Sequence, residues 1–287
     1  MKYTKRNVRK VLVVAGALVV LASLIAVVAW LLRGRARRKD GLATPRVPGT
    51  PPAGAIVAVN LSDFATVDDS LVFPRGAGPE IVNITQLAPA TFKFVLRHRG
   101  SWYDGDRDLK WNDDGHDKSR AEVSRLGGKN GPTMKPGETW DIGTTVWLDP
   151  SFVPSAGYCN IMQPVWDQSY LNLTAVNGND VTARLMVFTN GIGSNNKVAR
   201  EFTIRRGMWT SIVVRIKFAT NGYYKCSVNW DPFQGVNMDT TKGSQPFRAK
   251  WGLYSTGLRD INDRTLGDSI VQHRNIYMYK VPANIAG

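Results

Sequence analysis

The stretch 211–218 has the sequence SIVVRIKF, and it decides the fold class. Ile212, Val214 and Ile216 alternate with Arg215 and Lys217. In an extended strand successive side chains point to opposite faces, so the three aliphatic residues share one face and the two cations share the other. A strand with one apolar and one polar face suits an antiparallel sheet that covers a core on one side. This stretch therefore predicts a half-buried strand.

The same period of two recurs along most of the chain after residue 55. Residues 91–97, TFKFVLR, show it clearly, and similar short runs lie at 139–148, 169–175, 181–189, 198–205, 223–230 and 269–281. Asn-Gly pairs at 177–178, 190–191 and 221–222 separate several of these runs, as hairpin turns do. No convincing helical period occurs in this part of the sequence. We therefore predict an all-β antiparallel sandwich or jelly roll.

Residues 11–32, VLVVAGALVVLASLIAVVAWLL, form one uncharged apolar run. A helix rises about 1.5 Å per residue, so this run is long enough to cross the hydrocarbon core of a membrane. The apolar core of a secretory signal is shorter, and we therefore predict an uncleaved signal anchor, with a cleaved signal as the alternative. Basic residues are nearly balanced on the two sides, so the positive-inside rule does not decide the orientation.

We predict a single-pass membrane protein with a cytoplasmic N-terminus and an extracytoplasmic C-terminal domain. N-glycosylation sequons begin at Asn60, Asn83 and Asn172, which favours this orientation and a glycoprotein. The predicted parts are a basic tail, a transmembrane anchor, a basic and Pro/Gly-rich stalk, and a β-domain, at 1–10, 11–32, 33–54 and 55–287.

The net charge of +14 is concentrated at the N-terminus. Residues 1–50 contain eleven Lys and Arg against one Asp, so the remaining chain is only mildly basic. Such a distribution is typical of membrane-flanking charge, and we expect no nucleic-acid partner. The two cysteines, Cys159 and Cys226, are either one disulfide, as an extracytoplasmic domain permits, or two separate buried thiols.

Three segments place polar side chains on one strand face. In residues 119–125, SRAEVSR, Arg120 and Glu122 share a face, and in residues 249–255, AKWGLYS, Lys250 and Tyr254 do so around a glycine. The third segment, 160–166, NIMQPVW, carries Gln163 in an apolar run. If these faces belong to one sheet, they bring together a cation, an amide and a phenol.

These motifs resemble the jelly-roll polysaccharide lyases of the alginate, glucuronan and heparin lyase type. The family carries an Arg-x-Glu strand, a Gln-x-His strand and a Tyr-Phe-Lys-x-Gly-x-Tyr strand. Residues 120–122 match the first motif, residues 250–254 match the end of the third, and Gly207-Met-Trp209 is similar to the family's G-x-W strand entry. The resemblance spans about residues 80–281 and implies a concanavalin-like β-jelly-roll and a carbohydrate-binding lyase.

Two departures from the family pattern bear on catalysis. Gln163 is followed by Pro164 and Val165, so the usual histidine is absent, and Arg248 stands where the third motif opens with an aromatic residue. His116, in the Asp-rich loop before Arg120, is the candidate replacement, and His98 is the reserve.

The resemblance implies β-elimination on a uronate-containing, acidic polysaccharide. Arg120 or Gln163 would neutralise the uronate carboxylate, and His116 or a tyrosine phenolate would take the proton next to it. Tyr254 would protonate the leaving oxygen. Lys250 would assist it and, with Glu122, Asn172 and Arg184, bind substrate. No metal or other cofactor is required, although the Asp-rich loop at 104–117 permits calcium as an alternative. The competing hypotheses are a lectin-like binding module that has lost the chemistry and a structural surface or virion protein.

Overall fold

The computed structural model describes residues 50–69, 84–96, 118–128, 131–154, 158–165, 168–188, 196–241, 249–256 and 268–285. All of them belong to a compact unit that spans Val47–Gly287. The predicted basic tail, anchor and most of the stalk lie outside these residues, as do Asn83, His98, the loop at 104–117 with His116, and Arg248. Within the described part, no helix has the length and hydropathy needed to span a membrane.

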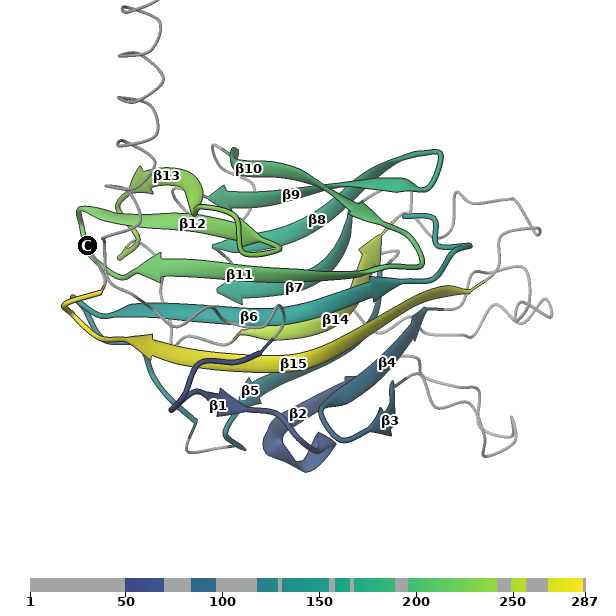
Figure 1. The fold of residues 1–287 in the computed structure, drawn as a ribbon, viewed down its shortest axis with the longest axis horizontal. Helices are drawn as coiled ribbons and strands as arrows, with labels where there is room; N and C mark the ends of the chain where they lie inside the picture. Colours follow the sequence, from purple (N-terminus) through teal and green to yellow (C-terminus); the bar gives the residue numbers. More distant parts are fainter. Residues whose placement is uncertain are drawn as a thin grey trace, which may run out of the picture. The chain divides into compact units, whose positions relative to one another are not determined.

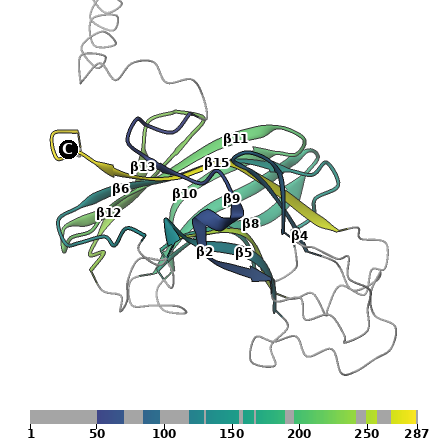
Figure 2. The ribbon, with the colours of Figure 1, turned by 90° about the horizontal axis from the view of Figure 1, so that it is seen from below.

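The described residues form two antiparallel sheets that pack face to face (Figures 1 and 2). In the first sheet the strands follow the order β13 (Gln234–Met238), β12 (Gly222–Val228), β11 (Trp209–Lys217), β6 (Thr139–Leu148), β15 (Ser269–Val281), β4 (Thr91–Leu96), β3 (Ile84–Ala88), and β1 (Ile56–Val57) also pairs with β15. In the second sheet the order is β10 (Asn196–Arg205), β9 (Asp180–Phe188), β8 (Ser169–Asn177), β7 (Cys159–Val165), β14 (Lys250–Thr256), β5 (Lys118–Leu126), β2 (Phe64–Asp69). The predicted all-β sandwich is confirmed.

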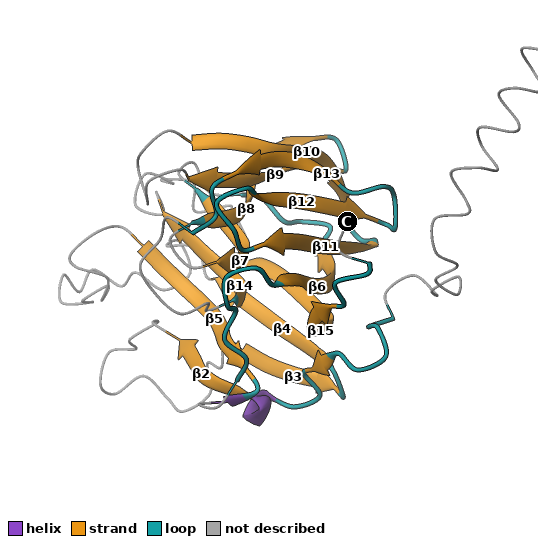
Figure 3. Ribbon diagram, turned by 90° about the vertical axis from the view of Figure 1, so that its left-hand side faces the viewer, coloured by secondary structure: helices purple, strands orange, loops and turns teal. Residues whose placement is uncertain are grey.

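Helix plays almost no part in this region of the chain. The single helical element among the described residues is the short 3-10 turn η1 (Leu61–Asp63), drawn in purple beside β2 and β3 in Figure 3. Asp63 Oδ2 accepts hydrogen bonds from the backbone N–H groups of Val59 and Asn60, both at 2.8 Å, which fixes its start.

The alternating pattern of β11 decides which of its faces is buried. Ile212, Val214 and Ile216 are fully buried between the sheets, whereas Arg215 and Lys217 keep part of their surface exposed on the outer face. Each fully buried aliphatic side chain contributes roughly 1.5–3 kcal/mol of transfer free energy. The strand pairs with β6 on one side and β12 on the other, so its apolar face lies at the centre of the first sheet.

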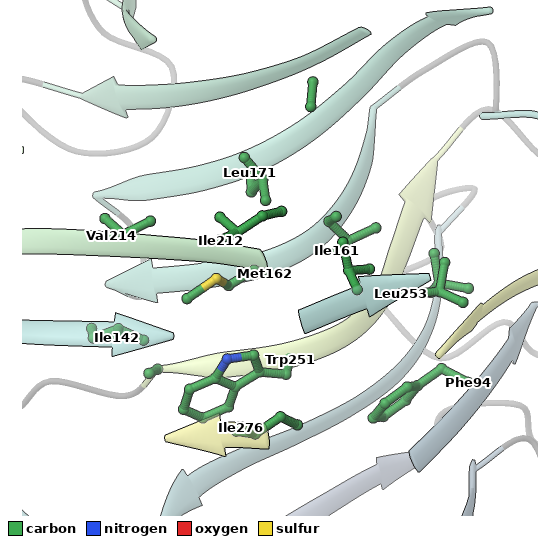
Figure 4. Packing of buried hydrophobic residues seen from close by; sticks show 14 of the residues in the cluster. Phe94, Ile142, Ile161, Met162, Leu171, Ile212, Val214, Trp251, Leu253 and Ile276 are labelled. Carbon is green, nitrogen blue, oxygen red and sulfur yellow. The ribbon is translucent and has the colours of Figure 1, made fainter. Parts of the chain in front are cut away.

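The core fills the space between the two sheets (Figure 4). The second sheet contributes Trp251 and Leu253 from β14, both fully buried, and the first sheet contributes Phe94 from β4. Because core residues alternate along each strand with residues on the outer face, the outer faces carry the polar side chains.

The structure decides between the two alternatives for the cysteines and excludes the disulfide. Cys159 on β7 and Cys226 on β12 are both buried thiols that form no disulfide, and they belong to strands of opposite sheets. Both belong to the hydrophobic core, and burial raises the pKa of the Cys226 thiol to about 12. The second alternative, two separate buried thiols, is therefore the one that the structure has.

Candidate functional site

The strands that carry the predicted site residues are neighbours in the second sheet. Strand β14 pairs with β5 on one side and β7 on the other. Tyr254 stands opposite Arg120 on β5 and Asn160 on β7. The pairing places the backbone of Arg120 in this row, and its side chain lies outside the described part of the structure.

A second row lies four residues along β14. Lys250 stands opposite Ser124 on β5 and Gln163 on β7. The Lys250 ammonium is 3.3 Å from Glu122 Oε2, and Gln163 Nε2 donates a hydrogen bond of 3.3 Å to Glu122 Oε1. Lys250, Gln163 and Glu122 therefore form one charged cluster on the outer face of the sheet.

This cluster is largely withdrawn from solvent. Glu122 is 3% exposed and Gln163 is 2% exposed, and the Lys250 side chain is 12% exposed. Two charges at this depth are held only if each has a partner, which the ion pair supplies. Gln163 Oε1 is buried without a hydrogen-bond partner among the described residues, so the amide keeps an unused acceptor.

Gly252, two residues along β14 from Lys250, has a backbone conformation that excludes a side chain. It pairs with Glu122 and has a φ of +133°, a backbone conformation that residues other than glycine rarely adopt. A Cβ atom at this position would lie 2.1 Å from the carbonyl oxygen of Ala121. The register between β14 and β7 also shifts next to Gly252. The Gln163 amide on β7 reaches past β14 to the carboxylate on β5.

Tyr254 is the half-buried phenol of the site. Its ring centroid is 5.3 Å from that of Tyr158 with an interplanar angle of 57°, so the two aromatic side chains support each other. Ser255 Oγ donates to the Tyr158 carbonyl at 3.3 Å, which ties the loop before β7 to β14. Asn160, which stands opposite Tyr254 on β7, is 2% exposed.

The row that begins at Tyr254 continues across the sheet. Asn160 stands opposite Asn172 on β8, Asn172 opposite Arg184 on β9, and Arg184 opposite Glu201 on β10. We call Glu122, Gln163, Lys250, Tyr254, Asn160, Asn172 and Arg184 the candidate face. Asn160 was not predicted, because a bulge in β7 between residues 160 and 162 breaks the parity that would have aligned it with Tyr254.

Asn172 and Arg184 already have protein partners. Asn172 Oδ1 accepts a hydrogen bond of 3.0 Å from the backbone N–H of Cys159, and Asn172 lies inside a strand that is paired on both sides. Arg184 Nε is 2.6 Å from Glu201 Oε2, with side-chain exposures of 42% and 54%. An exposed pair of this kind adds about 0–1 kcal/mol to stability and is readily rearranged by a ligand.

No described histidine lies on the candidate face. Val165, at the position of the family's histidine, is 4% exposed and belongs to the core. His116 and His98 lie outside the described residues. His273, which the sequence analysis did not single out, is fully buried on β15, with Nδ1 3.0 Å from Thr144 Oγ1. Burial lowers the pKa of His273 to about 3, so it is a neutral core residue.

The described residues contain no group of three or more His, Cys, Asp or Glu side chains arranged to hold a metal ion. The loop at 104–117, which prompted the calcium alternative, is not among them. The chemistry available on the described part of the candidate face is therefore that of a phenol, amides, a carboxylate and two cations.

Comparisons with known proteins identify the fold. No protein-family model matches the chain, and no curated protein matches it in sequence. An endo-β-1,4-glucuronan lyase from the fungus Trichoderma reesei is similar in structure, with a TM-score of 0.52 and 16% identity over 80% of this chain and 96% of that chain. An alginate lyase from Pseudomonas aeruginosa has a TM-score of 0.48 and 16% identity over 71% of this chain and 88% of its own.

Alginate lyase A1-II', a member of polysaccharide lyase family 7, has a TM-score of 0.46 and 14% identity over 71% of this chain and 85% of its own. At such identities a structural likeness establishes the fold and leaves the activity open. The chain thus has the jelly-roll fold found in polysaccharide lyases, and the resemblance that the sequence motifs predicted is confirmed at that level.

Proposed function

We propose that the candidate face binds a uronate-containing polysaccharide and cleaves it by β-elimination. In this reaction a base removes the proton from the carbon next to the uronate carboxylate. A carbon–carbon double bond then forms, the glycosidic carbon–oxygen bond breaks, and the leaving oxygen takes up a proton. The reaction needs donors for the carboxylate, one base and one acid, and all three roles fit side-chain types in the two polar rows.

The alignment of Tyr254 with Asn160, Asn172 and Arg184 carries this proposal. These four residues belong to consecutive neighbouring strands and stand at one level of the sheet. Strands lie about 4.8 Å apart, so the row from Tyr254 to Arg184 covers about 14 Å. A row of this length, with a phenol at one end and amides and a guanidinium along it, suits an extended acidic sugar chain better than a compact ligand.

Tyr254 is the group that we assign to proton transfer. It would protonate the leaving oxygen, and either its phenolate or His116 would act as the base. Arg120 or Gln163 would donate hydrogen bonds to the substrate carboxylate, where negative charge develops as the proton leaves. In the structure Gln163 Nε2 donates to Glu122, so Gln163 is positioned by the Glu122–Lys250 pair.

We also propose that residues 11–32 anchor the protein in a membrane with the β-domain on the extracytoplasmic side. The apolar run and the proline-rich segment after it support this arrangement. Proteolysis of intact and permeabilised cells, followed by detection of the β-domain, tests it. Protection of the domain in intact cells would contradict the orientation.

A second candidate function is binding without cleavage. The observation that favours it is the buried Val165, which cannot serve as the base that the family takes from this position. A lectin-like domain would use the same polar rows to hold the sugar chain and would need neither the phenol's acidity nor a histidine.

One experiment separates the two functions. The protein is incubated with alginate, glucuronan and heparin while ultraviolet absorbance is recorded, since elimination creates an unsaturated uronate that absorbs there. Tyr254→Phe should abolish the rise and keep polymer binding. Tyr279→Phe, a half-buried tyrosine on β15 of the first sheet, is the matched control and should react normally. Binding to all three polymers without any absorbance rise in the natural protein would exclude the lyase and leave the binding module.

A further inference from the structure

The outer face of the first sheet carries a pair of tryptophans in register. Trp209 on β11 stands directly opposite Trp147 on β6, and both are half-buried. Their strand neighbours Thr210, Val146 and Leu148 are buried on the other side, so the two indoles belong to the face that points away from the core. Two adjacent indoles in such a position expose an amphipathic surface that the core does not need.

Polar residues extend this row over two further strands. Trp147 stands opposite Gln272 on β15, and Gln272 stands opposite Lys93 on β4. Gln272 and Lys93 are half-buried as well. The row Trp209–Trp147–Gln272–Lys93 therefore crosses four strands, or about 14 Å at a strand spacing of about 4.8 Å. It presents aromatic surface at one end and an ammonium at the other.

A guanidinium lies over the aromatic end of this row. Arg274 on β15 has its Cζ 4.2 Å from the centroid of the Trp209 ring, within the range of a cation–π contact. Its Nε is buried without a hydrogen-bond partner among the described residues. Thr145, which stands directly opposite Arg274, is 3% exposed and its Oγ1 is buried without a described partner.

Neither cation of this surface has a carboxylate partner in the described part of the chain. The ion pairs found there use other residues, and none includes Arg274 or Lys93. The surface therefore combines two cations that form no ion pair with a described residue, two indoles and an amide. We call Trp147, Trp209, Gln272, Lys93 and Arg274 the tryptophan patch.

We propose that the tryptophan patch is a second binding surface, for an anionic saccharide chain, on the sheet opposite the candidate face. The apolar C–H face of a pyranose packs on an indole, while its carboxylate or sulfate meets Arg274 and Lys93 and its hydroxyls meet Gln272. Charge complementarity favours an anionic over a neutral sugar.

This surface goes beyond the proposed reaction and does not depend on it. A single sugar unit cannot touch both faces, because the core separates the two sheets. A polymer bound at the tryptophan patch would instead raise the local concentration of other chain segments near the candidate face. The chain would then hold long polymers better than short oligosaccharides.

Affinity measurements on the full-length protein test this proposal. Alginate, glucuronan and heparin are titrated against the natural protein and against Lys93→Gln with Arg274→Gln, which leaves both indoles in place. Loss of both charges should weaken binding of at least one of the three polymers about tenfold, the equivalent of about 1.4 kcal/mol. Trp147→Ala with Trp209→Ala should weaken the same polymer by a similar factor.

Lys225→Gln is the matched control. Lys225 lies over Tyr223 at 4.3 Å on the same sheet, in a similar cation–π contact outside the tryptophan patch. This variant should bind each polymer as the natural protein does. Unchanged polymer affinity in both patch variants, with unfolding midpoints equal to that of the natural protein, would overturn the proposal. Equal or tighter binding of single-stranded nucleic acid at the patch would overturn its assignment to saccharides.

Failure of the patch proposal can be distinguished from failure of the lyase proposal. Failure of the lyase proposal leaves the natural protein without an absorbance rise, whatever the patch variants do. Failure of the patch proposal leaves polymer affinity unchanged in its variants, whatever Tyr254→Phe does. Short oligosaccharides give a further readout, because the patch variants should process them at the natural rate if the candidate face is catalytic.

Discussion

Mild acid should destabilise this fold through one buried histidine. His273 lies in the core between the sheets, with no exposed surface. The ring of Phe94 packs edge-on against it at 5.4 Å, and its Nδ1 is 3.0 Å from Thr144 Oγ1. Burial lowers the pKa of His273 from 6.5 to about 3, because the core cannot solvate an imidazolium.

The sign and size of the effect follow from this difference in pKa. Below pH 6.5 the unfolded chain takes up a proton at His273, while the folded chain stays neutral until the pH approaches 3. The contribution of the neutral His273 to the free energy of unfolding is therefore fully present above pH 6.5, and it decreases as the pH drops towards 3. Each unit of pH in that window costs about 1.4 kcal/mol, so at pH 5 the free energy of unfolding should be about 2 kcal/mol lower than at pH 7.

Urea unfolding at pH 7, 6 and 5 measures this loss. His273→Asn is the control, since its amide keeps a hydrogen-bonding group near Thr144 and does not titrate. The variant will start from lower stability and should change little between pH 7 and pH 5. An equal loss in the natural protein and in the variant would refute the assignment to His273.

A second group, Glu138, titrates at a lower pH than the measurements at pH 7, 6 and 5 cover. Although desolvation acts to raise it, the pKa of Glu138 is held at about 2 by hydrogen bonds from Lys280, the Lys135 backbone and Trp140. A carboxylate with a lowered pKa stabilises the fold above its unfolded value of 4.5 and loses that contribution as the pH falls towards 2. Between pH 7 and pH 5 its contribution is constant, so it does not obscure that of His273.

Three further predictions concern the candidate face and the core. Gly252→Ala should lower the free energy of unfolding by roughly 3 kcal/mol or more, measured in urea, because its φ of +133° and the carbonyl 2.1 Å from a new Cβ both oppose a side chain. Glu122→Gln should cost about 3 kcal/mol by removing the carboxylate from the buried ion pair with Lys250, and adding Lys250→Met should restore part of that loss in a double-mutant cycle. Cys159 and Cys226 should resist a thiol reagent in the native protein and react once it is unfolded in urea, since both are buried and form no disulfide; fast labelling of the native protein would contradict this burial.

The central strands could be predicted from the sequence because each is paired on both sides and buries one whole face, which requires regular alternation of apolar and polar residues. The strands at 139–148 and 269–281 have the bounds that alternation predicted, and that predicted at 211–218 starts two residues earlier and ends one residue earlier. All three lie side by side inside the first sheet, where one face must be apolar over the whole strand length.

Most strands at the edges of the sheets could not be predicted in the same way, although the edge strand β10 was predicted at 198–205. Strands β1, β2, β3 and β13 were missed. An edge strand has one neighbour, and short edge strands need bury few side chains. In β3 one of five residues is buried, and in β13 none is, so neither carries enough alternation to be recognised.

The candidate site was predictable where strand parity holds and not where a bulge breaks it. Glu122, Lys250 and Tyr254 follow parity on two strands that pair with each other without a register shift. Asn160 lies before a register shift, so counting in twos from Gln163 puts it on the wrong face. His273, in contrast, shares its parity with the buried Val271, and that signal would have assigned it to the core.

The cations on the two outer faces differ in whether a carboxylate pairs with them, and this difference suggests that the two faces act at different steps of polymer binding. On the candidate face Lys250 is paired with Glu122 and Arg184 with Glu201, so neither cation offers a free charge to a distant polyanion. On the opposite sheet Arg274 and Lys93 have no carboxylate partner among the described residues. The tryptophan patch should therefore contribute more to the long-range attraction of an acidic polymer than these two compensated pairs do, because compensated pairs produce only a short-range field. The buried Glu122–Lys250 pair instead holds the Gln163 amide in place, as the proposed reaction requires of a group that donates to the substrate carboxylate.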